Sequence, residues 1–424
     1  MGTTDQYTFR TFPAATAADG SADPDTAAWL DAERRGFHDN RLDPAGRAAA
    51  AARLVADGRQ LTGVYTGDSG PVATFASFTG TLNVGAEDLL PTHLISNVTV
   101  RPTHRRRGLL RSMMTENLRR ASEAGFPLAA LTVSEATIYR RFGFGVATTV
   151  GHSTVSTGER FRMLVPPPGR AEYIELTELA RLAPAVFARF HAAHPGSVDR
   201  HAATWQRITG ELTDSGQPDL SVYAAAHYDD DGHPDGYVSY RSTSDSNPRT
   251  LEVLDLIAAT DGAYLGLWDF LASIDLAGLV DWKIAPADDP LRWAVADWRG
   301  ITQTFVEDWL WLRVLDVPAA FEARGYLPAA SGEIVLQVSD ALGYAAGTFR
   351  LRVADARASV TRLADTDAPD LTLDAPELGS LYLGGVDPLT LLAAGRLTEH
   401  TPGAARRLAA LLAPTAPVYG TSHF

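Results

Sequence analysis

The segment VTVRPTHRRRGLLR, residues 98–111, limits the possible folds of this 424-residue chain more than any other stretch of its sequence. It overlaps an apolar run, LISNVTV over 94–100, that has the composition of a buried β-strand. Behind the basic turn, apolar residues such as Leu109, Met113 and Leu118 share one face of a helix expected over 107–124. A strand, a turn and a helix in this order are typical of α/β folds.

The turn itself favours binding of an anion. Arg105, Arg106 and Arg107 precede Gly108 at the start of the expected helix. Backbone N–H groups at a helix N-terminus bind phosphate, and the helix dipole favours negative charge there. Three arginines oppose that dipole, so a bound polyanion would explain them, whereas the alternative is a basic helix start that is merely solvated. Gly108 would allow the backbone to approach a pyrophosphate closely.

Periodicity elsewhere divides the chain into three units, with VPPPGR (165–170) as a linker. The first unit is predicted to hold helices at 25–37, 44–56 and 135–141 and strands at 61–67, 71–79 and 127–133. The second is predicted to hold strands at 172–176, 220–227, 236–241, 249–258 and 279–285 and helices at 177–193, 199–209 and 262–273. The third, from about residue 310, is predicted to hold strands at 332–339, 346–353 and 358–362 and a helix at 402–413.

Composition and charge exclude several classes of protein. The net charge of −14 argues against a nucleic-acid partner. Residues 1–150 carry 16 Arg and 15 Asp+Glu, so the remaining residues, with 21 basic and 36 acidic side chains, carry the whole net negative charge. That acidic part would attract a cationic substrate or simply keep the protein soluble. The chain has no cysteine, no apolar run of the roughly 18 residues that a membrane helix needs and no signal-peptide pattern, so we expect a cytoplasmic protein without a membrane partner.

The basic turn also matches a known pattern. A strand followed by R/Q-x-x-G-x-G/A and a helix binds pyrophosphate in the GCN5-related N-acetyltransferases; Arg105 and Gly108 fit this pattern, whereas Leu110 stands where it has Gly or Ala. HRRRGLLR is the usual form in one branch, the Eis-like (enhanced intracellular survival) acetyltransferases, which this chain resembles. Further stretches that carry the resemblance are SEATIYRRFGFG (134–145), LDVPAAFEARGY (315–326), LGSLYLG (378–384) and the last residue, Phe424.

The resemblance implies a fold of two tandem acetyltransferase-like domains, each a mixed sheet with flanking helices, followed by an α+β domain like sterol carrier proteins. We place the domains at 1–155, 165–310 and 311–424. Only the first is expected to bind acetyl-CoA, and residues 171–310 indeed lack a second R-x-x-G turn. The resemblance further implies a homohexamer.

Site residues follow from the same resemblance. Those expected to bind acetyl-CoA are Val98, Thr99 and Val100 along the pantetheine arm, Arg106, Arg107, Gly108, Leu109, Leu110 and Arg111 around the pyrophosphate, and Ser134 and Glu135 beside the pantetheine end. Tyr139 is expected to protonate the leaving thiolate, and the α-carboxylate of Phe424 to accept the proton of the amine. A tyrosine hydroxyl with a pKa of about 10 is a plausible acid, whereas an α-carboxyl with a pKa of about 3.5 is a weak base.

Other candidates rest on weaker patterns. Asp39 is a possible ligand for a substrate ammonium or an ordinary turn residue, and Trp29, Phe37 and His423 are possible pocket walls or core residues. The run HAAHPGSVDRH, with histidines at 191, 194 and 201, has a spacing reminiscent of metal sites, but no cysteine or clear carboxylate accompanies it, so we predict no metal.

The sequence thus predicts transfer of an acetyl group from acetyl-CoA to a primary amine of a cationic small molecule, with polyamines or aminoglycosides suggested by the resemblance. Two alternatives stay open. One is an acetyltransferase acting on protein lysines, and the other is a ligand-binding protein that works through the sterol-carrier-like domain.

Overall fold

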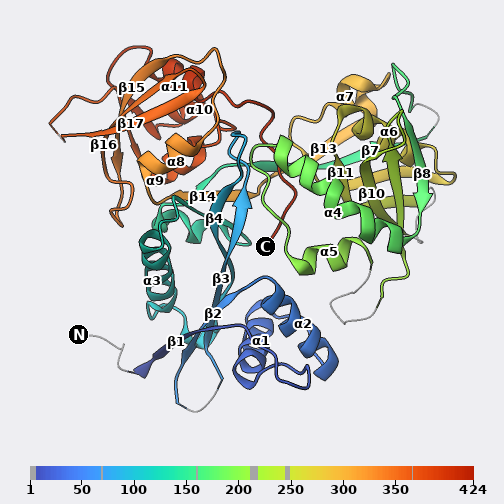
Figure 1. Ribbon diagram of the computed structural model, residues 1–424, viewed down its shortest axis with the longest axis horizontal. Helices are drawn as coiled ribbons and strands as arrows, with labels where there is room; N and C mark the ends of the chain where they lie inside the picture. The colour runs from blue at the N-terminus through green and yellow to red at the C-terminus, as the bar shows by residue number, and fades with distance from the viewer. Residues whose placement is uncertain (1–5, 68–69, 159–160, 211–217, 244–248, 365) are drawn as a thin grey trace.

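A computed structural model describes residues 6–67, 70–158, 161–210, 218–243, 249–364 and 366–424. Three sheets, each with its own helices, make up these residues (Figure 1). The end of the chain leaves the third unit and runs into the space between the first two. No helix in the described ranges has both the length and the hydropathy to cross a membrane.

The first sheet has the strand order β1-β2-β3-β4-β5-β14-β6. Its strands are β1 (Thr8–Pro13), β2 (Gln60–Tyr65), β3 (Ala73–Leu82), β4 (Leu90–Val100), β5 (Leu128–Thr132), β6 (Gly145–Val146) and β14 (Leu310–Val314), and its helices are α1 (Pro24–Phe37), α2 (Pro44–Ala56) and α3 (Leu109–Glu123). Adjacent residues of β3 separate the two faces, since Ala76 packs with Trp29 of α1 whereas Phe75 packs with Met113 of α3. Helices α1 and α2 therefore cover one face and α3 the other.

The second sheet has the order β13-β7-β12-β11-β10-β9-β8. Its strands are β7 (Thr149–Ser156), β8 (Arg170–Ile174), β9 (Val222–Tyr228), β10 (Pro234–Thr243), β11 (Arg249–Ala258), β12 (Ala277–Pro286) and β13 (Ile301–Asp308), with helices α4 (Leu176–Ala193), α5 (Ala202–Ile208), α6 (Asp261–Ala272) and α7 (Leu291–Ala294). Helix α4 continues through Pro184 and packs Phe187 and Phe190 against the sheet.

The third sheet has the order β17-β16-β15-β18-β19. Its strands are β15 (Gly332–Ser339), β16 (Gly347–Ala354), β17 (Arg357–Leu363), β18 (Leu371–Asp374) and β19 (Leu397–Glu399), with helices α8 (Val317–Ala323), α9 (Ala375–Leu381), α10 (Pro388–Ala393) and α11 (Ala404–Leu412). The backbone of α9 packs directly on β14, where a Cβ on Gly379 would lie 2.3 Å from the carbonyl oxygen of Leu312. This contact joins the third unit to the first.

Two strands cross the domain boundaries expected at residues 155 and 310. Strand β7 lies in the expected first domain except for its last residue, Ser156, yet it pairs with β12 and β13 of the second sheet. Strand β14 follows the second unit, yet it pairs with β5 and β6 of the first sheet, placing Leu310 opposite Thr132. At the level of the sheets, the first two units therefore exchange strands, and the expected boundaries need this correction. Neither strand carries a local signal of which sheet it joins.

Most helices and strands predicted from the sequence agree with the structure within a few residues, including α1, α2, α3, α4 and α6. The helix expected over 135–141 is instead two short 3₁₀ turns, Ala136–Ile138 and Arg140–Phe142, on either side of Tyr139. The prediction did not include β1, β7, β13, β18 or β19 as strands, or β14 as a strand of the first sheet.

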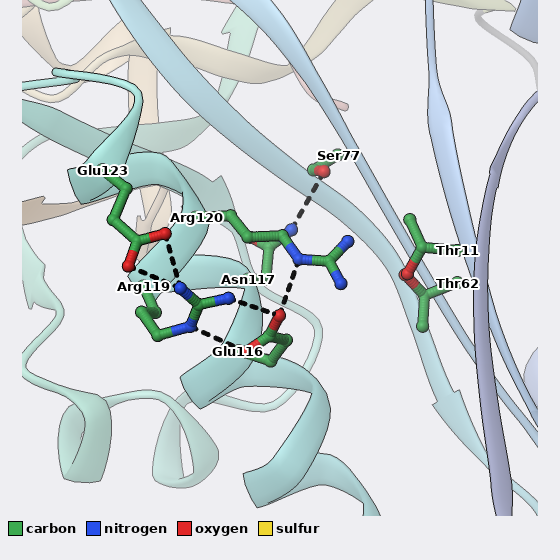
Figure 2. A network of polar contacts seen from close by, with 8 residues as sticks. All are labelled: Thr11, Thr62, Ser77, Glu116, Asn117, Arg119, Arg120 and Glu123. Atoms are coloured by element: carbon green, nitrogen blue, oxygen red, sulfur yellow. Dashed lines mark hydrogen bonds and ion pairs between the residues drawn. The ribbon is translucent and has the colours of Figure 1, made fainter.

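Helix α3 is fixed on the first sheet by a polar contact beneath it. The Asn117 amide donates to Ser77 of β3 at 3.0 Å, and its Oδ1 lies 2.7 Å from the Nε2 of His93 on β4. On the exposed side, Arg119 forms ion pairs with Glu116 and Glu123 (Figure 2). The exposed pairs contribute little to stability, whereas the Asn117 contacts orient the helix whose N-terminus carries the arginine turn.

Candidate active site

The parallel strands β4 and β5 diverge in the middle of the first sheet. Their pairing ends with Ile95 opposite Leu131, although β4 continues to Val100. The pairing of β4 with β3 shifts register just beyond this point, where Asn97 adopts a left-handed conformation with φ of 51°. A bulge of this kind bends the strand away from its neighbour. It leaves a backbone edge of β4 without a partner strand on the β5 side.

Val100 lies on this open edge. The N–H of Arg101 donates to the carbonyl of Val72 at 2.9 Å, which makes Val100 and Ala73 a pair that exchanges no backbone hydrogen bonds. The N–H and C=O of Val100 therefore point away from β3, toward the diverging β5. Thr99, in contrast, is buried and bonds through its hydroxyl to Thr74 at 2.7 Å. Of the predicted Val98–Val100 segment, Val98 also lines the pocket described below.

The arginine turn ends in a helix start that has no side-chain cap. Gly108 is the N-cap of α3 with φ of 80°, and no side chain accepts from the first N–H groups of the helix. A Cβ on Gly108 would meet no atom within 4 Å, so the space above it is open. Arg107 turns back to Tyr7 and to the carbonyl of Thr103, whereas Arg106 is exposed with φ of 62°. An anion would therefore find backbone donors and cationic side chains together.

Three further predicted residues follow on α3. Leu109 is buried in the core against the sheet, so only its backbone faces the turn. Leu110 is half-buried and Arg111 is exposed. The Leu110 position, where the general pattern has a small residue, thus packs partly against the apolar cluster of the first domain.

A pocket of about 390 Å³ lies where β4 and β5 diverge. Its walls come from both acetyltransferase-like units and from the end of the chain. Residues that line it include Trp29, Glu33, Arg34 and Phe37 of α1, Arg53 of α2, Asp57 and Arg59, Ile95 to Val98 of β4, Leu131 and Thr132 of β5, Ser134, Tyr139, His201, Thr204, Gln206 and Arg207, and His423 and Phe424. The structure therefore brings together Trp29, Phe37, Val98, Ser134, Tyr139, His423 and Phe424 among the residues singled out from the sequence.

Tyr139 lies in this pocket between the two 3₁₀ turns and is 8% exposed. Burial, with a smaller contribution from the negative charge of Glu135, raises the pKa of Tyr139 to about 12. The phenol therefore keeps its proton near neutral pH, as a proton donor must. Glu135 itself is exposed, so its effect on Tyr139 is electrostatic.

Phe424 is held between the first two units. Its N–H donates to the Thr132 hydroxyl at 3.3 Å, and that hydroxyl lies 2.9 Å from the Phe424 oxygen. Its ring packs edge-on against Phe78, with ring centres 5.9 Å apart. The side chain is only 7% exposed, so the last residue is a packed part of the pocket.

The residues before Phe424 are anchored on the second unit. Trp309 donates to the carbonyl of Ser422 at 3.0 Å, and the Thr421 hydroxyl accepts from Arg200 at 2.7 Å. Arg200 is itself buried in a bidentate pair with Asp255, at 2.7 and 2.8 Å. Tyr419 donates to the carbonyl of Ile284 on β12. The tail, residues 419–424, thus connects the strands of the second sheet to the pocket of the first.

A buried polar cluster on the pocket wall was not anticipated from the sequence. Asn97 donates through its amide to Glu33 at 2.9 Å and accepts from Arg59 at 2.9 Å. Arg59 also pairs with Asp57 at 3.1 Å and lies 4.2 Å from the ring centre of Phe78. The only sequence signal was Glu33 on the apolar face of a helix, three residues from Leu30 and four from Trp29.

Charge in the pocket differs from the expectation that the acidic second unit would attract a cation there. Among the described lining residues, the second unit contributes Arg207 and His201 but no carboxylate. Burial first, and then nearby cations including Arg59 and Arg207, lower the pKa of His201 to about 3, and burial also lowers that of His423. Both imidazoles are therefore neutral near pH 7.

Asp39 lies outside the lining of the pocket. Its carboxylate is about half exposed and lies 3.5 Å from a guanidinium nitrogen of Arg34. The three histidines of the 191–201 run also have other partners. His191 bonds to Thr81 and Ser197, His194 to the carbonyl of Phe190, and His201 to the Thr204 hydroxyl at 3.2 Å. Within the described ranges, no three His, Asp or Glu side chains gather as metal ligands would.

Comparisons with protein families match all three units. Two segments, 20–147 and 196–314, match the family models of GNAT acetyltransferase domains, and residues 317–420 match that of the sterol carrier protein domain. The predicted fold class, two tandem acetyltransferase-like domains followed by a sterol-carrier-like domain, is thereby confirmed.

Individual relatives cover most of the chain. An N-acetyltransferase Eis from Mycobacterium tuberculosis is 38% identical over 351 residues, which is 81% of this chain and 83% of that protein. An uncharacterized N-acetyltransferase from Streptomyces avermitilis is 36% identical over 92% of this chain and 94% of its own length. The crystal structure of Eis1 from Mycobacterium abscessus superposes with a TM-score of 0.82 at 28% identity, covering 98% of this chain and all of that one.

Proposed function

This chain belongs to the Eis family of acetyl-CoA-dependent N-acetyltransferases, and on that premise we propose that it acetylates a primary amine of a cationic small molecule by direct attack. Tyr139 is the general acid and the carboxylate of Phe424 the general base of this proposal. The observation that carries it is the meeting of both residues in one pocket, although they lie 285 positions apart in the sequence.

The residues of the first domain fit acetyl-CoA. The uncapped start of α3 and Arg106 would hold the pyrophosphate, and the open edge of β4 would hydrogen-bond the pantetheine arm, which ends near Ser134. Acetyl-CoA supplies the thioester that the amine attacks. The N–H of Val100, pointing away from β3, is the proposed donor to the oxygen that gains negative charge.

Proton transfers through Phe424 and Tyr139 complete the proposed reaction. An amine with a pKa near 10 arrives as an ammonium and must lose a proton before its lone pair attacks the carbonyl carbon. The Phe424 carboxylate, which the Thr132 hydroxyl holds in place with a hydrogen bond of 2.9 Å, accepts that proton. As the C–N bond forms and the C–S bond breaks, the Tyr139 hydroxyl gives its proton to the sulfur. The acetylated nitrogen then loses its second proton to the tyrosinate, which restores the Tyr139 hydroxyl.

The finer substrate class and the cellular setting also belong to this proposal. Polyamine- and aminoglycoside-like amines are the substrates to test first. In this proposal the enzyme is a homohexamer and works in the cytoplasm. Protein lysines are less favoured, because the pocket lies between two domains and the tail and is walled by α1, α2 and α5. An extended lysine side chain would have to reach past exposed lining residues such as Phe37 and Arg207.

Steady-state release of CoA tests the proposal, with spermidine and kanamycin as acceptors. The native chain is compared with one extended by a single glycine after Phe424, which removes the carboxylate from its position but keeps the ring. We expect turnover by the native chain and its loss in the extended one. Equal rates would show that Phe424 is not the base, and absence of turnover with any amine would contradict the proposed substrate class.

A further inference from the structure

Glu33 is a buried carboxylate on the wall of the pocket that the proposed mechanism does not use. It lies on α1, is 8% exposed and faces the pocket together with Trp29 and Phe37 of the same helix. Burial of an ionised carboxylate is costly unless a cation or several hydrogen-bond donors compensate it.

The described residues give Glu33 only one such partner. Its Oε1 accepts the amide of Asn97 at 2.9 Å, and no cationic side chain of the described residues lies within ion-pair distance of it. The nearby cations have other partners, since Arg34 lies against Asp39 and Arg59 is bound to Asp57.

Several other buried carboxylates of this chain have an arginine partner, whereas Asp289 instead accepts from the Tyr264 hydroxyl and the Leu291 N–H. Asp57 is bound by Arg59, Asp255 by Arg200 and Asp340 by Arg313. Burial raises the pKa of Glu33, an effect opposed by the amide of Asn97, by Arg34 and by Arg59 and enhanced by Asp39. An external cation in the pocket would compensate the charge of Glu33 as those arginines do for the others.

The position of Glu33 fits such a cation. Asn97 occupies the bulge at which β4 leaves β5, so its amide fixes Glu33 beside the open edge of the strand. An ammonium bound there would lie in the same pocket as Tyr139 and Phe424.

We propose that Glu33 binds the ammonium group of the acceptor amine and is a specificity-determining residue for cationic amines. This inference rests on the proposed function, whose acceptor is an amine. It gives the substrate's positive charge a partner within the first domain, in place of the acidic surface of the second.

A structural role is the competing explanation, in which Glu33 only holds Asn97 in the bulge. Glu33→Gln separates the two, because the glutamine oxygen still accepts the Asn97 amide but carries no charge. Asp31→Asn is the matched control, a carboxylate of the same helix that pairs with Arg47 and is about half exposed.

Isothermal titration of spermidine onto the full-length protein is the direct experiment, with CoA release measured in parallel. Loss of a charged hydrogen bond predicts that Glu33→Gln weakens spermidine binding by at least about tenfold, and we expect the KM for acetyl-CoA to stay unchanged. Asp31→Asn should bind as the native protein does. Equal affinity in Glu33→Gln, or no binding to the native protein, would overturn the proposal.

The proposed function fails in a different way. Its failure shows as turnover that survives the glycine extension, whatever the affinity of Glu33→Gln for spermidine. If Glu33→Gln binds spermidine normally while the extended chain is inactive, the assignment of Glu33 is wrong and the acid–base mechanism stands.

Discussion

Both acetyltransferase-like domains contain two parallel strands that are joined by a helix and stop pairing partway along. In the first, β4 and β5 part after Ile95, and in the second, β11 and β12 part after Val253. In each case the strand before the helix shifts register against its other neighbour at this point, between Thr74 and Ala76 on β3 and between Ser239 and Tyr240 on β10. The backbone geometry that can admit a cofactor is thus present twice.

The two helix starts differ. Helix α3 follows a turn with three arginines and has no side-chain cap, whereas α6 is capped by the Thr260 hydroxyl, which accepts from Ala263 N–H at 3.1 Å. Asp261 in the first turn of α6 and Asp235, which accepts from Thr260 at 2.6 Å, add negative charge there. A pyrophosphate would be repelled at α6 and attracted at α3.

The regions beyond the points where these strands part also differ between the two domains. Beyond Val253, Asp255 is bound by Arg200, which in turn holds Thr421, and Tyr419 bonds to Ile284 of β12. The second domain therefore uses the region that corresponds to the cofactor site to anchor the tail that completes the first. The comparison teaches that a duplicated fold keeps its strand geometry while the helix cap and a few buried charges decide what it binds.

Removal of Arg200, which anchors the tail on the second domain, should have the largest effect on stability. Arg200→Met leaves the buried Asp255 without its cationic partner, although the Tyr237 hydroxyl still donates to it at 2.7 Å. The loss of the ion pair costs about 3–5 kcal/mol of unfolding free energy, and the substitution also detaches Thr421. Urea unfolding measures the loss, and Arg200→Met combined with Asp255→Leu should recover part of it. An Arg200→Met protein as stable as the native one would show that the second domain does not depend on this pair.

Tyr139→Phe should affect turnover next most strongly. Loss of a general acid lowers kcat by about a hundredfold or more, while the KM for acetyl-CoA should stay the same because the ring still packs against Phe144. Tyr223→Phe, which changes an exposed tyrosine on β9 of the second domain, is the control. Unchanged kcat in Tyr139→Phe would remove this residue from the mechanism.

Charge reversal in the arginine turn should have a smaller effect, which concerns only the KM for acetyl-CoA. Arg106→Glu is expected to raise the KM for acetyl-CoA by about tenfold, as loss of one charged contact does. Arg120→Gln on α3, at a residue that pairs with Glu116, is the control and should leave the KM for acetyl-CoA unchanged.

Thr260→Val at the start of α6 should cost about 1 kcal/mol of stability without altering the KM for acetyl-CoA. A shift in that KM would indicate that the second domain also binds cofactor.

Acid should weaken the fold by a modest amount through His201. Its pKa is about 3 in the folded protein, because of burial and nearby cations, against about 6.5 in the unfolded chain. Between these values the unfolded state binds more protons, so stability falls as the pH falls. From pH 6.5 to 5.5, the loss due to this group is about 1 kcal/mol. His201→Gln should remove that part of the slope in urea unfolding, and an identical slope would contradict it.

Local chemistry allowed much of this to be predicted from sequence. The strand, the arginine turn and α3 follow from periodicity and from Gly108, and the resemblance indicated Tyr139 and Phe424, which the structure brings into one pocket. The exchange of β7 and β14 was not predicted, because local patterns indicate a strand but not the distant strand with which it pairs. Glu33 and Asn97 were missed for a similar reason, since their relation depends on a bulge that brings residues 64 positions apart into contact.

The number of acetyl-CoA molecules bound per chain tests the contrast between the two domains most directly. Isothermal titration of acetyl-CoA onto the native protein should give one site per chain, and Arg106→Glu should weaken that site while Thr260→Val leaves it intact. Two sites per chain, or a single site that responds to Thr260→Val but not to Arg106→Glu, would contradict the assignment of cofactor binding to the first domain.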